Sequence, residues 1–279
     1  MRLAVFLHQQ APTLGIVQGP GILPVSNVSL SDVLENPGTL ESLRGLKGDL
    51  LAFDQVRLLA PLPFPYRNVL CVGLNYAEHI HEFQRPGRKF PEAPVFFTKA
   101  AGAVNGPHSD IPFDPNASTQ LDWEVELGVV IGRGGKNICE EEAFNHVFGY
   151  VVVNDVSARD LQTRHQQFFK GKSLDGTCPV GPWIATADEV PDSHNLVLRC
   201  RVNGVVKQDG NTADMIFRIP RLIAELSRGM TLHPGDLIST GTPSGVGFSR
   251  TPPEFLAPGD VVECEIEGIG SIRNQVVQI

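Results

Sequence analysis

Leu121-Asp-Trp-Glu-Val-Glu-Leu-Gly-Val-Val-Ile131 is the stretch that decides the fold. Its alternation of acidic and apolar residues is typical of a β-strand and would place Asp122, Glu124 and Glu126 on one face. Three like charges in a row repel one another, and Asp and Glu are unfavourable in strands, so a positive partner is expected above that face. A solvated strand face is the alternative that the alternation leaves open.

Carboxylates two residues apart on one strand face can share a single cation. Such side chains lie about 6 to 7 Å apart, so two of them can each offer one oxygen to a hard cation. Asp155 follows the apolar run Gly149-Tyr-Val-Val-Val-Asn154 and would add a third carboxylate at the end of the next strand. An all-oxygen set of this kind favours Mg²⁺ or Mn²⁺.

Composition limits the classes of function. The chain has 279 residues, of which 42% are hydrophobic and 19% charged, as in a soluble globular protein. The net charge of −8 argues against a nucleic-acid partner, and no apolar run is long enough for a membrane span or a signal peptide. We therefore expect a cytoplasmic protein. The 5 cysteines form no C-x-x-C pair, which argues against zinc and disulfides.

The order of predicted elements favours a β-rich α+β protein. A Pro-rich bridge, Leu58–Pro65, predicts a boundary between a small N-terminal domain at 1–62 and a catalytic domain at 63–279. Strands are predicted over 69–72, 95–98, 196–202, 236–240 and 261–266, and helices over 76–83, 140–148 and 219–230. Gly132-Arg-Gly-Gly-Lys136 lacks the spacing of a phosphate-binding loop, which argues against nucleotide chemistry.

The predicted helix at 76–83 carries two His–Glu pairs. His79 and Glu82 lie three residues apart on one face, so the carboxylate can orient the imidazole as a general base. His81 and Glu78 form a similar pair on another face, and an exposed polar helix is the alternative for both.

Two further segments are candidates for substrate contacts. The segment Gln84–Glu92 is basic and broken by Gly and Pro, which suits a lid or an ordinary surface loop. It contains Arg85, Arg88 and Lys89, which would suit a second carboxylate or hydroxyls of a substrate. The other segment is Leu161–Lys170.

Several blocks in order resemble the fumarylacetoacetate hydrolase family, in particular its shorter acylpyruvate-hydrolase-like branch. The blocks are Val72-Gly-Leu-Asn-Tyr76, Phe97-Thr-Lys99, Glu124-Val-Glu126, Asn154-Asp-Val-Ser-Ala-Arg-Asp160, Gly171-Lys-Ser-Leu-Asp175 and Gly241-Thr-Pro-Ser-Gly-Val-Gly247. The resemblance implies a mixed β-roll or barrel of the family's C-terminal type, a small N-terminal α/β domain and a homodimer. It also implies that Glu124, Glu126 and Asp155 bind Mg²⁺ or Mn²⁺.

The resemblance further implies a hydrolase that cleaves a carbon–carbon bond in a 2,4-diketo acid, giving pyruvate and a carboxylic acid. His79, oriented by Glu82, would activate water, and Lys172 would stabilise developing oxyanion charge. The metal would stabilise the enolate left by cleavage. The implied substrate contacts are Lys99, Arg159, Gln162 and Thr242.

Three readings of function remain open. The hydrolase is preferred, with an acylpyruvate, fumarylpyruvate or diketo-deoxy sugar acid as its small-molecule oxoacid substrate. The alternative is an isomerase of a 2-hydroxy-dienoic diacid or an oxaloacetate decarboxylase that uses the same metal–enolate chemistry. The third is a cation-binding scaffold without catalysis.

Overall fold

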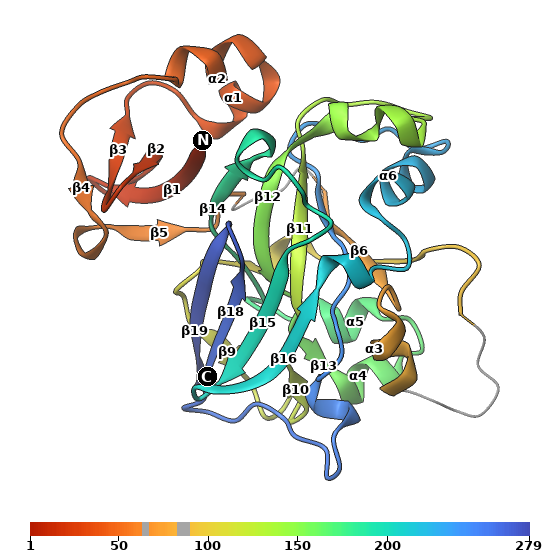
Figure 1. Cartoon of the computed structure of the whole chain (residues 1–279). Coiled ribbons are helices and arrows are strands. Elements are labelled where there is room, and N and C mark those ends of the chain that lie inside the picture. The colour runs from red at the N-terminus through yellow and green to blue at the C-terminus, as the bar shows by residue number, and fades with distance from the viewer. Residues whose placement is uncertain (63–66, 83–89) are drawn as a thin grey trace.

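The computed structural model describes residues 1–62, 67–82 and 90–279 and shows a β-rich α+β fold built on two large sheets (Figure 1). The larger sheet has the order β4-β3-β2-β1-β14-β12-β11-β17-β6-β7, with β5 paired to β1 and β8 to β14. Its strands are β1 Arg2–His8, β2 Ala11–Gln18, β3 Gly21–Val25, β4 Leu51–Ala52, β5 Arg57–Leu59, β6 Val69–Gly73, β7 Val95–Lys99, β8 Val104–Asn105, β11 Val125–Ile131, β12 Val147–Asn154, β14 Cys178–Thr186 and β17 Leu237–Ser239.

The second sheet has five strands in the order β16-β15-β18-β19-β9, and a short pair, β10 with β13, stands apart. Their bounds are β9 Ile111–Phe113, β10 Leu121–Asp122, β13 Ser157–Ala158, β15 Val197–Val202, β16 Val205–Asn211, β18 Val261–Ile266 and β19 Gly270–Gln278. The α-helices are α1 Leu30–Glu35, α2 Pro37–Leu43, α3 Ala77–Glu82, α4 Arg159–Arg164, α5 Phe169–Lys172 and α6 Ile219–Ser227. The prediction of the fold class is confirmed.

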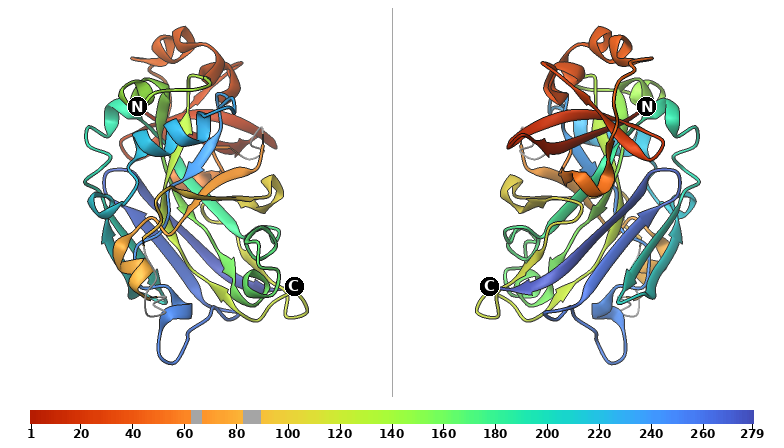
Figure 2. Two further views of the ribbon diagram at one scale, coloured as in Figure 1. Left: turned by 90° about the vertical axis from the view of Figure 1, so that its right-hand side faces the viewer. Right: turned by 90° about the vertical axis from the view of Figure 1, so that its left-hand side faces the viewer.

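Strands β11 and β12 form the centre of the molecule and are covered on both faces. Figures 1 and 2 show the five-stranded sheet, teal and blue, lying across these two green strands. Leu127 and Val129 belong to the core shared with that sheet, whereas Val130 belongs to a second core shared with the N-terminal strands. All seven residues of β11 are therefore buried, and a solvated acidic face is excluded for Glu126.

The N-terminal region extends the large sheet. Strand β1 pairs antiparallel with β14, so that Leu3 lies opposite Ile184 (Figure 1). Leu3 and Val5 are buried in the same apolar cluster as Val151. The predicted domain boundary near residue 62 stays a prediction, with the two parts joined by a continuous sheet and a shared core.

Two element predictions differ from the structure. The single strand predicted over 121–131 is two strands, β10 and β11, interrupted at Trp123 and Glu124. The helix predicted over 140–148 is a 3₁₀ helix at Glu140–His146, and the chain continues into β12 at Val147. Pairing of Val147 with Ile131 of the central sheet satisfies backbone groups that a longer helix would have used. Helix α6 confirms the prediction for 219–230, although it ends at Ser227.

Candidate active site

Three buried carboxylates converge where β11 and β12 meet. One oxygen each from Glu124, Glu126 and Asp155 lies within 4.8 Å of the other two. Their residues are 4%, 1% and 0% exposed. Such burial is costly for carboxylates unless cations or hydrogen-bond donors surround them. Among the described residues, no other group of acids, histidines or cysteines meets this geometry.

The break in the predicted strand places Glu124. The Glu124 N–H donates to Asn154 Oδ1 (3.1 Å), and the Asp155 N–H donates to the Glu124 carbonyl (2.9 Å). Gln208 on β16 accepts the N–H of Val125 (3.0 Å). These hydrogen bonds hold the chain where the regular ladder is interrupted, so the carboxylates of Glu124 and Glu126 can face the same point.

Glu126 is held from the side of β17. Its Oε2 accepts the Ser239 hydroxyl (2.6 Å) and the Gly241 N–H (2.9 Å). Burial, followed by repulsion from Asp155 and Glu124, raises the pKa of Glu126 to about 8. A cation placed between the three acids would reverse that repulsion and favour the ionised form.

Two lysines approach the acids from different sides. Lys172 Nζ lies 2.8 Å from Glu124 Oε2 and 2.6 Å from Asp155 Oδ2. Lys99 Nζ lies 2.8 Å from Asp155 Oδ1 and donates to the Val156 carbonyl (2.9 Å). Burial opposes ionisation of Glu124, but the charges of Lys172, Arg159 and His79 outweigh it and hold the pKa of Glu124 below its usual range.

Asp122, the first acid of the predicted row, binds an arginine instead of joining the other acids. Its Oδ2 contacts Arg159 Nε and Nη2, both at 2.8 Å, and it accepts the N–H groups of Gly247 (2.7 Å) and Phe248 (3.0 Å). Arg159 Nη2 also lies 2.6 Å from Glu124 Oε1, and its Nη1 donates to Gln162 Oε1 (3.1 Å). The guanidinium therefore has a fixed orientation at the edge of the acidic cluster.

The buried charges in this region do not balance. Four carboxylates face three cationic side chains, all buried: Asp122, Glu124, Glu126 and Asp155 against Lys99, Arg159 and Lys172. With all seven groups ionised the cluster carries one excess negative charge, which attracts a cation; protonation of Glu126, whose pKa is raised to about 8, is the other way to remove it.

Of the two His–Glu pairs, the structure places His79 at the cavity and His81 outside it. His79 is 6% exposed, and its Nδ1 lies 3.0 Å from Glu82 Oε2. The other oxygen of Glu82 accepts the Gly245 N–H (2.6 Å) and the Ser249 hydroxyl (3.0 Å). His81 is exposed and packs edge-on against the ring of Phe90 at 5.5 Å.

A cavity of about 400 Å³ brings these groups together. Of the predicted site residues, it is lined by His79, Glu124, Glu126, Arg159, Gln162, Lys172 and Thr242. Lys99 is fully buried beside Asp155 and is not part of the lining. Of the segment 161–170, Thr163, Gln166 and Phe168 line the cavity in addition to Gln162. Arg85, Arg88 and Lys89 lie outside the described residues.

The sequence interpretation assigned no individual role to several residues of the site, although Ser157 and Gly241 stand in the blocks quoted for the family resemblance. Ser239 and Gly241 hold Glu126, Ser157 donates to Glu124 (3.2 Å), and Gln208 donates to the hydroxyl of Thr242 (2.7 Å). Thr242 itself donates to the Val125 carbonyl (2.9 Å), so its hydroxyl is engaged with the protein. These contacts join distant segments, and no local pattern could have indicated them.

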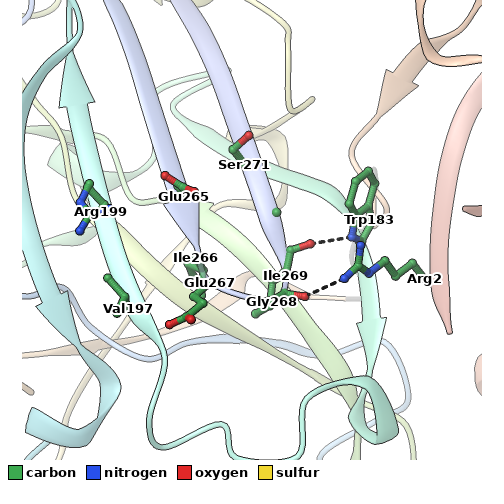
Figure 3. A pocket seen from close by; sticks show the side chains of 11 residues that line it. Arg2, Trp183, Val197, Arg199, Glu265, Ile266, Glu267, Gly268, Ile269 and Ser271 are labelled. Carbon is green, nitrogen blue, oxygen red and sulfur yellow. Dashed lines mark hydrogen bonds between the residues drawn. The ribbon is translucent and has the colours of Figure 1, made fainter. Parts of the chain in front are cut away.

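A second cavity, of about 560 Å³, lies between the start of β1 and the β18–β19 hairpin (Figure 3). Trp183 Nε1 donates to the Ile269 carbonyl (2.7 Å), and Arg2 Nη2 donates to the Gly268 carbonyl (3.2 Å). Its acids, Glu265 and Glu267, form no cluster with a third ligand among the described residues. Among its described lining residues, this cavity has no cluster of three carboxylates and no histidine, unlike the first cavity.

Within the described part of the chain, no helix is long and apolar enough to cross a membrane.

Comparisons with known proteins match this site to one family. The sequence profile described as "Fumarylacetoacetate (FAA) hydrolase C-terminal" matches residues 68–277. An oxaloacetate tautomerase of Bacillus subtilis, YisK, is 47% identical over 81% of this chain and 75% of its own length. The human mitochondrial oxaloacetate tautomerase FAHD2B is 43% identical over 99% of this chain and 92% of its own length.

Solved structures agree with the fold. A fumarylacetoacetate hydrolase from Exiguobacterium antarcticum superposes with a TM-score of 0.86 at 42% identity, covering 100% of both chains. A 2-hydroxyhepta-2,4-diene-1,7-dioate isomerase from Mycobacterium marinum has a TM-score of 0.81 at 35% identity, covering 100% of this chain and 98% of its own. A maleylpyruvate hydrolase from Sphingobium, solved with manganese(II) and pyruvate, has a TM-score of 0.80 at 31% identity, covering 100% of this chain and 99% of its own.

These findings correct the predicted activity. The preferred reading, hydrolysis of a carbon–carbon bond in a 2,4-diketo acid, is wrong, because relatives at 43% and 47% identity are named oxaloacetate tautomerases. Solved neighbours named 2-hydroxyhepta-2,4-diene-1,7-dioate isomerase and 5-carboxymethyl-2-hydroxymuconate delta-isomerase point the same way. The alternative, isomerase-type chemistry, fits the comparisons better. The cytoplasmic location and the homodimer stay predictions.

Proposed function

Because the chain belongs to the fumarylacetoacetate hydrolase family, we propose that it is a divalent-metal-dependent tautomerase of 2-oxo acids, with oxaloacetate as the first substrate to test. The observation that carries the proposal is the convergence of three buried carboxylates, two of which, Glu124 and Glu126, line one cavity together with His79. Interconversion of keto and enol forms needs a group that stabilises charge on the 2-oxo oxygen and a group that moves a proton at C3. The cavity offers candidates for both.

Mg²⁺ or Mn²⁺ fits the donor set of Glu124, Glu126 and Asp155. All three donors are carboxylate oxygens, which hard divalent cations prefer, and the excess negative charge of the cluster favours a cation. The site has the three protein ligands expected if substrate or water supplies the rest. A bound cation would polarise the 2-oxo group and make the C3–H bond more acidic.

His79 is the proposed proton carrier at C3. It lines the cavity, and its Nδ1 lies 3.0 Å from Glu82 Oε2, so the carboxylate can orient the ring while Nε2 exchanges a proton with the substrate. The Gly245 N–H donates to Glu82 in turn, so the loop that follows β17 orients the His79–Glu82 pair. Tautomerisation requires no attacking water, so the same dyad serves without the hydrolytic role first predicted.

The remaining charged and polar side chains of the cavity would bind and orient the substrate. Lys172, between Glu124 and Asp155, is placed to stabilise negative charge on the 2-oxo oxygen. Arg159 and Gln162 line the cavity side by side, and their N–H groups suit a substrate carboxylate. Lys99 does not line the cavity, so its proposed role is to hold the Asp155 carboxylate and not to contact the substrate.

A second candidate function is the isomerisation of a 2-hydroxy-dienoic diacid. Neighbours named as such isomerases are 35% and 33% identical and cover this chain completely. That reaction also moves a proton between oxygen and carbon atoms of a conjugated 2-oxo acid, so it needs the same groups. The distal part of the substrate distinguishes the two candidates.

The direct test follows the loss of the oxaloacetate enol by its ultraviolet absorbance in the presence of Mg²⁺ or Mn²⁺. We expect acceleration that EDTA removes and that Glu126→Gln abolishes, because one anionic ligand of a hard cation is lost. Glu263→Gln, a change to a partly exposed acid of β18, is the matched control and should keep the activity. Full activity in excess EDTA would contradict the metal assignment. Turnover of the dienoic diacid alone would favour the second candidate.

A further inference from the structure

Part of the wall of the active-site cavity, called the apolar wall below, is apolar, and the rest is strongly charged. Its apolar side chains are Val72, Leu74, Phe97, Phe168 and Phe248. The rings of Phe97 and Phe168 meet edge to face, with centroids 5.4 Å apart and planes at 75°. This arrangement is favourable for aromatic pairs and fixes both rings.

The backbone is strained where it presents Leu74 to this cavity. Leu74 has φ of 57°, in the left-handed region that residues with a Cβ rarely adopt. The adjacent Asn75 holds the turn: its Nδ2 donates to the carbonyls of Thr240 (2.7 Å) and Phe217 (3.1 Å), and its Oδ1 accepts the Phe217 N–H (2.8 Å). Strain of this kind costs about 1 to 3 kcal/mol and is concentrated at functional sites. Here it occurs at a residue that lines the same cavity as His79.

The cavity is also large for a four-carbon acid. Its volume of about 400 Å³ falls within the range of about 300 to 1,000 Å³ that holds drug-sized ligands. A substrate held at the acids through its carboxylate and 2-oxo oxygen would leave its C3 substituent in the rest of the cavity. Leu74 and the two paired phenylalanines offer that substituent an apolar surface.

We propose that this site also tautomerises 2-oxo acids with an apolar, aryl-type substituent on C3, for which phenylpyruvate is the probe. The inference rests on the proposed function and adds a class of substrate to it. In the enol-to-keto direction, the O–H proton leaves the 2-hydroxyl, the C2–O double bond forms, and the electron pair of the C2–C3 double bond takes a proton at C3. No oxidant or further reactant is needed, and no carboxylate on C4 takes part.

The test compares phenylpyruvate enol with oxaloacetate enol as substrates of the metal-loaded full chain. Phe168→Ala removes a ring that lines the cavity, and Phe169→Ala removes its exposed neighbour, which is 47% exposed and does not line it. We expect Phe168→Ala to lower the ratio of kcat/KM for phenylpyruvate to that for oxaloacetate by at least about tenfold, because apolar contacts of this size discriminate by such factors. Phe169→Ala should leave the ratio unchanged.

A binding measurement separates recognition from catalysis. Trimethylpyruvate carries an apolar C3 and has no C3–H, so it binds without reacting. Calorimetry should show that Phe168→Ala weakens trimethylpyruvate binding and leaves the dissociation constant of oxalate, which lacks a C3 substituent, nearly the same.

The outcomes are distinct. Acceleration of oxaloacetate but not of phenylpyruvate would overturn this inference and leave the proposed function standing. Equal effects of Phe168→Ala and Phe169→Ala on the ratio would overturn the role of the apolar wall. Activity toward neither substrate would overturn the proposed function and this inference together.

Discussion

Asp122 and Glu124 are two residues apart in the sequence and share Arg159 as a partner, yet only Glu124 joins the other acids. Asp122 is fully buried and takes two contacts from Arg159, while Glu124 faces Glu126 and Asp155. The strand is interrupted at Trp123 and Glu124, and of the two acids only Glu124 comes within reach of Glu126 and Asp155. A pattern of acids on a strand therefore indicated the site but not the role of each acid.

Because the Asp122–Arg159 ion pair is buried, removing one of its charges should lower the free energy of unfolding more than breaking an exposed pair does. Asp122→Asn leaves the guanidinium without its full counter-charge, and breaking a buried pair costs about 3 to 5 kcal/mol. Urea unfolding measures the decrease in the free energy of unfolding. Asp209→Asn, which removes the exposed partner of Arg199, should cost less than about 1 kcal/mol. Similar losses in the two variants would show that the buried pair is not specially stabilising.

The two histidines of α3 should differ in their effect on activity. His79→Ala should slow tautomerisation by about 10² to 10⁴, as expected for loss of a general acid–base group, with metal binding retained. His81→Ala removes an exposed ring from the same helix and should change the rate little. Steady-state rates for both variants, with Mn²⁺ affinity measured in parallel, decide the matter. An unchanged rate in His79→Ala would move the proton carrier to another group.

At the scale of elements, the loop after β17 fixes the position of α3. The Gly245 N–H bonds to Glu82, and the Ser244 hydroxyl donates to Glu78 (3.2 Å). Gly245 has φ of 103°, and a Cβ there would lie 2.1 Å from the Lys207 carbonyl oxygen. Only glycine fits this close approach, so the loop sequence is tied to the orientation of His79 on another element.

Gly245→Ala should therefore reduce both stability and kcat. The control is Gly259→Ala, because Gly259 has φ of 96° but a Cβ there would meet no atom within 4 Å. Both variants carry the backbone strain of about 1 to 2 kcal/mol, but only Gly245→Ala also has the collision. Thermal unfolding and kcat measured side by side test the difference. Equal losses in both would mean that strain alone, and not the close approach, explains the glycine.

At the scale of the whole molecule, the N-terminal strands and the catalytic region share one sheet and one core. Leu3 of β1 is fully buried with Val151 and Val180, whereas Leu7 of the same strand is 37% exposed. Burial of apolar surface across the predicted boundary couples the folding of the two parts.

Leu3→Ala should destabilise the whole chain by about 2 to 5 kcal/mol while unfolding stays a single transition. Leu7→Ala, on the same strand, should have a smaller effect because the side chain is partly in water. Calorimetry with and without Mn²⁺ is the measurement. A separate low-temperature transition that shifts with Leu3→Ala and not with Mn²⁺ would show that the N-terminal region unfolds independently.

The sequence by itself determined the family, the fold class and the three acids that converge. These follow from local signals: β-strand alternation, apolar runs bounded by turns, and short blocks in a fixed order. The apolar positions of α6 and the pairing of His79 with Glu82 also follow from helical spacing, which is a local property.

Only the tertiary structure decided which groups face the cavity and what surrounds them. Ser239 and Arg159 reach the acids across sheets and turns, Gln208 holds the backbone of Val125 between Glu124 and Glu126, and Lys99 lies against Asp155 instead of in the cavity. Such contacts join residues far apart in the chain, and local periodicity carries no information about them. The α-helix predicted over 140–148 also differs for a long-range reason. Strand pairing of Val147 with Ile131 outweighed local helix propensity, so only a 3₁₀ helix forms at Glu140–His146.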